Sequence, residues 1–172
     1  KNGISDIGEN KQQEAQSKWP ELTLPGVTTH FIGHLQSNKA KKVVEMFDLI
    51  QSVDSLKLAE VISRAAGEKG KVQRCLVEVK ISQEDTKSGV TALELEKLCH
   101  HIKELPHLDL CGLMTIGGLG LTEDQTRESF RDLRNKFDGL KDLFGSKPVL
   151  SMGMSDDFEL AIEEGSTMVR LG

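Results

Sequence analysis

Short apolar runs alternate with longer amphipathic segments along almost the whole sequence. Runs such as CLVEVKI lie between polar turns and are rich in β-branched residues, which is typical of buried strands. Segments such as 55–69 carry apolar residues at helical spacing instead. The pattern predicts seven strands, at residues 4–8, 29–35, 48–53, 75–81, 110–116, 149–154 and 167–171. It predicts six helices, at residues 9–18, 37–47, 55–69, from 91 to just before Pro106, 122–143 and 155–164.

Two of these helices begin with the spacing of a capping box. Thr91 precedes Glu94 by three residues, and Thr122 precedes Gln125 in the same way. In this arrangement each side chain bonds a backbone N–H that the first helical turn leaves unpaired. We therefore expect helices to begin at both places.

Strand–helix alternation with short loops favours parallel strands joined by right-handed crossovers, and so an α/β fold. An open doubly wound sheet and an eight-stranded (β/α)8 barrel both fit the pattern. Lys1-Asn2-Gly3 resembles a helix end, and the chain stops directly after a strand-like run, so we expect flanking segments at both termini. A first strand outside this sequence would complete a TIM-type barrel. Without a linker or composition shift, residues 1–172 are predicted to form one incomplete barrel domain.

Composition narrows the function classes. A net charge of −5 argues against nucleic-acid binding, because that binding depends on basic side chains that neutralise phosphates. The sequence has no apolar run of about 18 residues, the length that a membrane span needs. Three cysteines without C-x-x-C spacing indicate reduced thiols rather than disulfides or zinc. We expect a cytoplasmic monomer.

Candidate chemistry lies at the predicted strand ends, because barrel active sites form there and phosphate often binds after the last two strands. Ser151 and Gly153 lie within one such strand and Ser155 follows it, while Arg170 lies near the end of the next strand and Gly172 follows that one. Hydroxyls and open backbone edges could bind an anion, and Arg170 could face a charged or ring-nitrogen acceptor. The alternative is that Ser155 only caps a helix.

Other motifs give weaker signals. His30 and His34 are predicted on one face of a strand, but without a third ligand we favour hydrogen-bonded or packing histidines over a metal site. The GGLG turn lacks the third glycine of the dinucleotide fingerprint. The basic run KAKK fits a solvated helix face.

Several motifs, in order, resemble one known family: IGEN, HFIGHLQSNKAK, SVDSLKLA, KSGV, GLMTIG, LSMGMSDDF and EEGSTMVRLG. The sequence is similar to the YggS/PROSC family of pyridoxal phosphate homeostasis proteins, whose barrel is similar to the N-terminal domain of alanine racemase. The resemblance covers nearly the whole chain. It implies a (β/α)8 barrel that carries one pyridoxal 5′-phosphate (PLP).

The resemblance also implies roles for individual residues. Ser151 and Gly172 would bind the PLP phosphate, and Arg170 would face the pyridine nitrogen. Asn10, His34 and Met114 would line the cofactor. The family's Schiff-base lysine lies upstream of Lys1, so it is absent from this sequence. Three positions depart from the family pattern: Ile7, Lys11 and Lys80 replace a usual Phe, Tyr and Asn.

Two functions from different classes follow from the resemblance. The first is a non-catalytic protein that sequesters PLP and can deliver it to PLP-dependent apo-enzymes. The alternative is a racemase-like PLP enzyme, which needs a second acid/base, usually a Tyr from a partner's second domain. This sequence contains no Tyr, which favours the first function.

Overall fold

The computed structural model describes residues 3–19, 26–80, 89–118 and 120–172. Its strands are β1 (Asp6–Glu9), β2 (Thr28–Phe31), β3 (Leu49–Val53), β4 (Gln73–Glu78), β5 (Leu108–Met114), β6 (Val149–Met154) and β7 (Met168–Arg170). Its helices are α1 (Gln12–Lys18), α2 (Ala40–Met46), α3 (Leu56–Glu68), α4 (Ala92–Glu104), α5 (Glu123–Leu140) and α6 (Phe158–Glu163), with short 3-10 turns at Ser37–Lys39 and Lys141–Leu143. The seven strands and six helices predicted from the sequence are all present.

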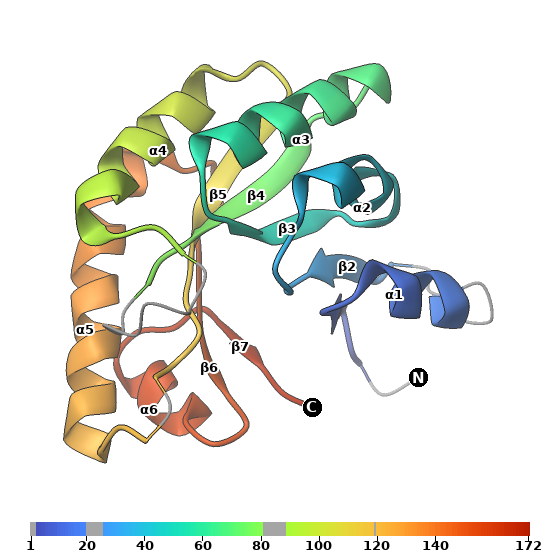
Figure 1. Ribbon diagram of the computed structural model, residues 1–172. Helices are drawn as coiled ribbons and strands as arrows, with labels where there is room; N and C mark the ends of the chain where they lie inside the picture. Colours follow the sequence, from blue (N-terminus) through green and yellow to red (C-terminus); the bar gives the residue numbers. More distant parts are fainter. Residues whose placement is uncertain (1–2, 20–25, 81–88, 119) are drawn as a thin grey trace.

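The strands form one parallel sheet in the order of the sequence, with β1 and β7 at its two edges. The sheet curves, and the helices lie around its outside (Figure 1). The curvature is strong enough for Gln51 on β3 to hydrogen-bond Ser151 on β6, although two strands separate them in the sheet. The predicted barrel class is therefore confirmed: the strands form a nearly closed parallel α/β barrel.

Local sequence signals explain where several helices begin. The capping boxes of Thr91 with Glu94 and of Thr122 with Gln125 are both formed, as predicted. The Ser55 hydroxyl accepts a hydrogen bond from the backbone N–H of Leu58 and so caps α3. Each cap satisfies a donor that the helix itself leaves unpaired.

Several predicted boundaries were wrong; strands β4 and β5, for example, each begin two residues earlier than predicted. Three of the differences, at the carboxyl ends of strands, affect the site. Strand β1 continues to Glu9, so α1 begins only at Gln12. Strand β2 ends at Phe31, and His34 lies beyond it rather than on the same strand face as His30. Helix α6 begins at Phe158, because Asp157 Oδ1 accepts from the backbone N–H of Met154 at 2.6 Å and holds a turn between strand and helix. Ser155 therefore does not cap α6.

Parts of other predictions lie outside the described residues. These are the first two residues of the chain, most of the loop after Trp19, Ile81 at the predicted end of β4, the first two residues of the KSGV motif and Leu119 in the glycine-rich turn.

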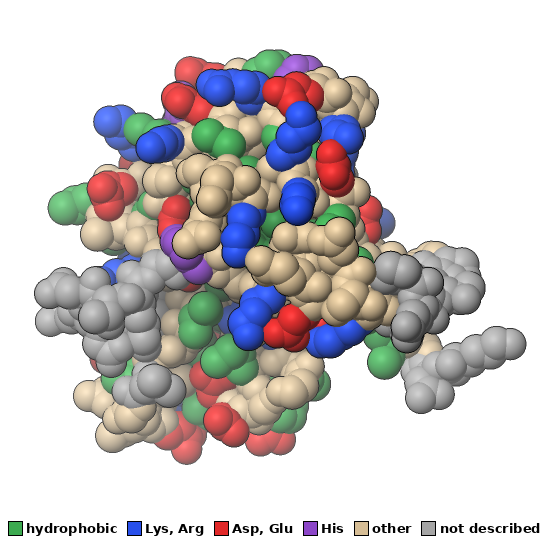
Figure 2. All heavy atoms as spheres, turned by 45° about the vertical axis from the view of Figure 1, so that its right-hand side comes forward, with side chains coloured by type: hydrophobic (Ala, Val, Ile, Leu, Met, Phe, Trp, Pro, Cys, Tyr) green, Lys and Arg blue, Asp and Glu red, His purple; other side chains and the backbone are tan. Residues whose placement is uncertain are grey.

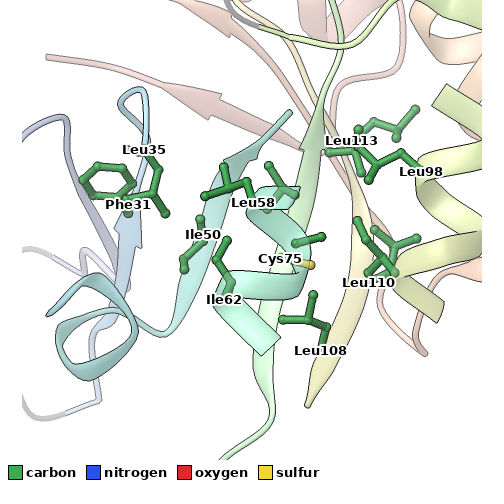
Figure 3. Close-up of a cluster of buried hydrophobic side chains, with 14 of the residues drawn as sticks. Phe31, Leu35, Ile50, Leu58, Ile62, Cys75, Leu98, Leu108, Leu110 and Leu113 are labelled. Atoms are coloured by element: carbon green, nitrogen blue, oxygen red, sulfur yellow. The ribbon is translucent and has the colours of Figure 1, made fainter. Parts of the chain in front are cut away.

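The main hydrophobic core lies between the outer face of the sheet and the helices. Figure 3 shows part of it, with Leu58 and Ile62 of α3 against Ile50 and Cys75 of the sheet. A smaller cluster packs inside the barrel: Leu49, Leu76, Cys111, Met114 and Val149. Neighbouring residues such as Leu49 and Ile50 belong to different cores because side chains alternate across a strand.

The surface in Figure 2 carries Lys and Arg side chains interspersed with Asp and Glu. Some form exposed ion pairs, such as Lys41 with Glu68 at 2.9 Å, which contribute little to stability. Within the described part of the chain, the structure contains no helix of the length and apolarity that a membrane crossing requires.

Candidate functional site

A pocket of about 350 Å³ opens at the carboxyl ends of the strands, between the two edges of the sheet. Its wall combines glycines, at which the backbone is accessible, with apolar side chains and a few polar groups. The lining residues are Gly8, Glu9, Asn10, Ile32, Ile116, Met154, Ser155, Arg170, Leu171 and Gly172. This is the end of a parallel barrel at which ligands bind.

Arg170, at the end of β7, is the cation of this wall. Its Nη1 donates to the Ser151 hydroxyl at 2.7 Å, and its Nη2 donates to the Thr115 carbonyl at 2.8 Å. Burial lowers the pKa of the guanidinium, while Asp157 and Glu78 raise it. Arg remains protonated even so, and two of its five N–H donors are engaged in these bonds, so donors remain for a ligand.

Ser155 and Gly172 form a second polar element of the wall. The Ser155 hydroxyl accepts from the backbone N–H of Gly172 and donates to the Gly172 carbonyl oxygen, both at 3.4 Å, which is long for a hydrogen bond. Gly172 has φ +149°, a conformation that side chains disfavour. Because both contacts are long, the hydroxyl and the N–H can exchange them for stronger bonds to an anionic oxygen.

Strand β6 reaches this wall because Gly153 lets α6 pack closely against it. A Cβ at Gly153 would lie 2.5 Å from Ala161 Cβ, and the residue has φ +95°. A glycine is therefore needed at the point where β6 passes into the turn that carries Ser155.

The structure brings three of the six predicted cofactor residues to the pocket: Asn10, Arg170 and Gly172. The other three lie elsewhere. Ser151 is fully buried inside the barrel, below the wall, and bonds Arg170 and Gln51. Met114 is fully buried in the inner cluster. The side chain of His34 is 60% exposed and faces Asp54, with 3.6 Å between Nδ1 and Oδ2.

A chain of polar side chains inside the barrel was missed by the sequence analysis. The His30 imidazole lies between Asp6 and Gln51, with Nε2 at 3.0 Å from Asp6 Oδ1 and Nδ1 at 2.8 Å from Gln51 Nε2. Gln51 Oε1 accepts from the Ser151 hydroxyl at 2.7 Å, and Ser151 in turn accepts from Arg170. One signal could have found it: Gln51 interrupts the apolar run LIQSV at a position that alternates with Ile50.

The histidines and cysteines considered in the sequence do not come together in a common site. His30 bonds Asp6 and Gln51, whereas His34 faces Asp54, so the two histidines do not converge. No group of three or more His, Cys, Asp or Glu side chains that could hold a metal occurs among the described residues. The three cysteines are buried and unpaired, and burial raises the pKa of each thiol, that of Cys99 to about 12.

Comparisons with known proteins agree with this geometry. The family model described as the N-terminal domain of alanine racemase matches residues 1–172. The pyridoxal phosphate homeostasis protein of Aquifex aeolicus is 42% identical over 99% of this chain and 75% of its own length. The Escherichia coli K12 protein of the same name is 39% identical over 99% of this chain and 74% of its own length.

The solved structure of PipY from Synechococcus elongatus with PLP bound is also similar to this chain. It has a TM-score of 0.91 and 41% sequence identity, over 99% of this chain and 80% of PipY. The Aquifex aeolicus and Escherichia coli relatives are named as homeostasis proteins and not as enzymes.

Proposed function

This chain belongs to the family of pyridoxal phosphate homeostasis proteins, and we propose that it binds PLP in the pocket at the mouth of its barrel. One observation carries the proposal. A single pocket wall combines Arg170, which uses two of its five N–H donors within the protein, with the Ser155 hydroxyl and the Gly172 backbone N–H, whose contacts with each other are long, at 3.4 Å. A pyridine nitrogen and a phosphate are two acceptors on one small molecule, and this wall offers donors for both.

Ser155 and the Gly172 backbone N–H would hold the phosphate. We assign the phosphate to Ser155 rather than to Ser151, the residue that the resemblance implied. The Ser151 hydroxyl is fully buried and held by two bonds of 2.7 Å, whereas the contacts of Ser155 with Gly172 are 3.4 Å long and easier to exchange. Asn10, on the facing β1 edge of the pocket, would contact the rest of the cofactor.

Arg170 would donate to the pyridine nitrogen. A guanidinium has only donors, so the nitrogen beside it must act as an acceptor and stay unprotonated. Bound PLP supplies an aldehyde that reacts with amines and a ring that withdraws electrons, and the ring withdraws less strongly when its nitrogen carries no proton. This position of Arg170 therefore favours storage of the cofactor over chemistry on it.

The pocket also offers little acid/base chemistry. Among the lining residues that the structure describes, Glu9 and Arg170 alone ionise, and the Glu9 carboxylate pairs with Lys18 at 2.9 Å. The racemase alternative needs two acid/base groups on opposite faces of the ring, and the sequence holds no Tyr. We therefore propose a non-catalytic protein that sequesters PLP and delivers it to PLP-dependent apo-enzymes.

PLP titration of residues 1–172, followed by absorbance, tests the proposal. No lysine lines the described pocket, so we expect saturable binding of one PLP that leaves no covalent adduct after borohydride reduction. An absence of saturation would refute binding at this site. A stoichiometric phosphopyridoxyl adduct on a lysine within 1–172 would refute the proposed non-covalent mode.

Delivery has its own test. PLP-loaded protein should reactivate an apo-enzyme in the presence of an amine that traps free PLP. Reactivation no faster than with free PLP and the same trap would refute the delivery role.

A further inference from the structure

The polar chain inside the barrel connects the pocket to the opposite end of the sheet. It runs from Asp6 at the start of β1, through His30, Gln51 and Ser151, to Arg170 at the end of β7. His30, Gln51 and Ser151 are each at most 3% exposed. Barrel interiors of this kind are normally filled by branched apolar side chains, and buried polar groups are costly unless they are paired.

In this polar chain, the donor and acceptor of each hydrogen bond determine those of the next. Because the Ser151 hydroxyl accepts from Arg170, its own hydrogen is free for the Gln51 oxygen. The Gln51 nitrogen then faces His30 Nδ1, which must be the acceptor. His30 therefore carries its proton on Nε2 and donates it to Asp6.

If the donors and acceptors were reversed along the polar chain, the same atoms would not all have hydrogen-bond partners. If the Gln51 amide were turned over, its nitrogen would donate to Ser151, which already accepts from Arg170. The Ser151 hydrogen would then lose its acceptor, and His30 would need a proton on Nδ1. Only a neutral His30 with its proton on Nε2 gives each hydrogen bond of this polar chain one donor and one acceptor.

We propose that Gln51 and His30 are positioning residues for Arg170, which hold the Ser151 hydroxyl as a fixed acceptor and thereby fix the guanidinium that meets the cofactor ring. This inference rests on the proposed function, since it takes Arg170 as the contact to the pyridine nitrogen. Gln51 and His30 do not line the pocket, so they act only through Ser151 and Arg170.

The first test compares two buried glutamines. Gln51→Met removes the middle link, while Gln73→Met is a matched control: Gln73 is fully buried on β4, and its amide bonds only the Asp48 and Arg74 carbonyls among the described partners. We expect Gln51→Met to weaken PLP binding about tenfold, the equivalent of about 1.4 kcal/mol. Gln73→Met should change the melting temperature but not PLP affinity.

Two further readouts separate positioning from general damage. Gln51→Met should shift the absorption spectrum of bound PLP, because the ring nitrogen meets a less ordered guanidinium, and should leave the affinity for inorganic phosphate unchanged. Equal loss of PLP affinity in both glutamine variants, or unchanged PLP affinity in Gln51→Met, would overturn the proposal.

The second test needs no cofactor. Nitrogen-15 NMR of the histidine side chains should show His30 neutral at pH 7.5, with the proton on Nε2. A proton on Nδ1 would overturn the inference even if PLP binds. If wild-type protein binds no PLP, the proposed function fails, while the same spectrum still decides whether the polar chain has the direction inferred here.

Discussion

Replacement of Ser151 by alanine should destabilise this protein far more than replacement of Ser52, although both serines are fully buried in strands. The Ser151 hydroxyl donates to Gln51 and accepts from Arg170, both at 2.7 Å. The Ser52 hydroxyl is buried with no hydrogen-bond partner among the described residues. The two substitutions remove the same atom from fully buried positions, and they differ in the bonds that are lost.

The magnitude follows from those bonds. A neutral buried hydrogen bond contributes about 1 kcal/mol, and one to a charged group about 1.5–3 kcal/mol. Ser151→Ala should therefore lower the free energy of unfolding by about 3 kcal/mol. For a chain of this length that loss corresponds to a fall in melting temperature of about 6–12 °C. Ser52→Ala breaks no described bond and removes an unpaired buried hydroxyl, so its stability should be unchanged or slightly higher.

Urea unfolding and thermal melts of the two variants measure the difference. Similar losses in both variants, or a loss below about 1 kcal/mol in Ser151→Ala, would refute the assignment of the Ser151 bonds. The denaturant slopes should match that of the wild type, so that the comparison reports stability and not a change in the unfolded state.

Two other predictions concern the strand ends and pH. Gly33→Ala should weaken PLP binding and lower the melting temperature, because a Cβ there would overlap the Asn10 carbonyl oxygen at the pocket; unchanged PLP affinity in a folded variant would contradict this. Burial lowers the pKa of His30, an effect that Asp6 and Asp48 oppose and Arg74 reinforces. The stability that depends on neutral His30 should thus be complete above the unfolded-state pKa of about 6.5 and be lost as pH falls below it. His30→Asn keeps an acceptor for Gln51 and cannot titrate in this range, so urea unfolding should show a weaker pH dependence in it; identical pH profiles would contradict the prediction.

Periodicity predicted the order and type of the elements because each strand and helix buries one face. The outer core contains Ile50, Val77 and Leu113 at the alternating strand positions, with the apolar stripes of α3 and α4 against them. Parallel pairing followed from the alternation itself. The barrel then forms when the sheet of seven parallel strands curves in one direction.

The strand ends were predicted less well, because tertiary contacts set them. The Asp157 carboxylate bonds the backbone N–H of Met154 and delays α6, and Gly33 packs on the Asn10 backbone where β2 has ended. A serine four residues earlier or later in the same motif looks equivalent in sequence. Ser151 lies inside the barrel and Ser155 on the pocket wall only because the strand ends between them.

Arg170 and Gly172 lie at the barrel mouth because strand β7 ends there, and the strand–helix alternation indicates that position. Gln51 was not expected to matter, because its partners Ser151 and His30 come from strands that meet only after the sheet has curved. A polar residue inside an apolar strand signals a buried partner, but the sequence does not identify that partner.

The affinity of Ser155→Ala for PLP and for pyridoxal tests the central claim most directly. Ser155 would hold the phosphate, so the variant should bind PLP about tenfold more weakly than wild type and bind pyridoxal, which lacks the phosphate, equally well. Ser17→Ala, at an exposed serine of α1 outside the pocket, should bind both as the wild type does. Unchanged PLP affinity in Ser155→Ala, or an equal loss for PLP and pyridoxal, would contradict a phosphate site at the mouth of this barrel.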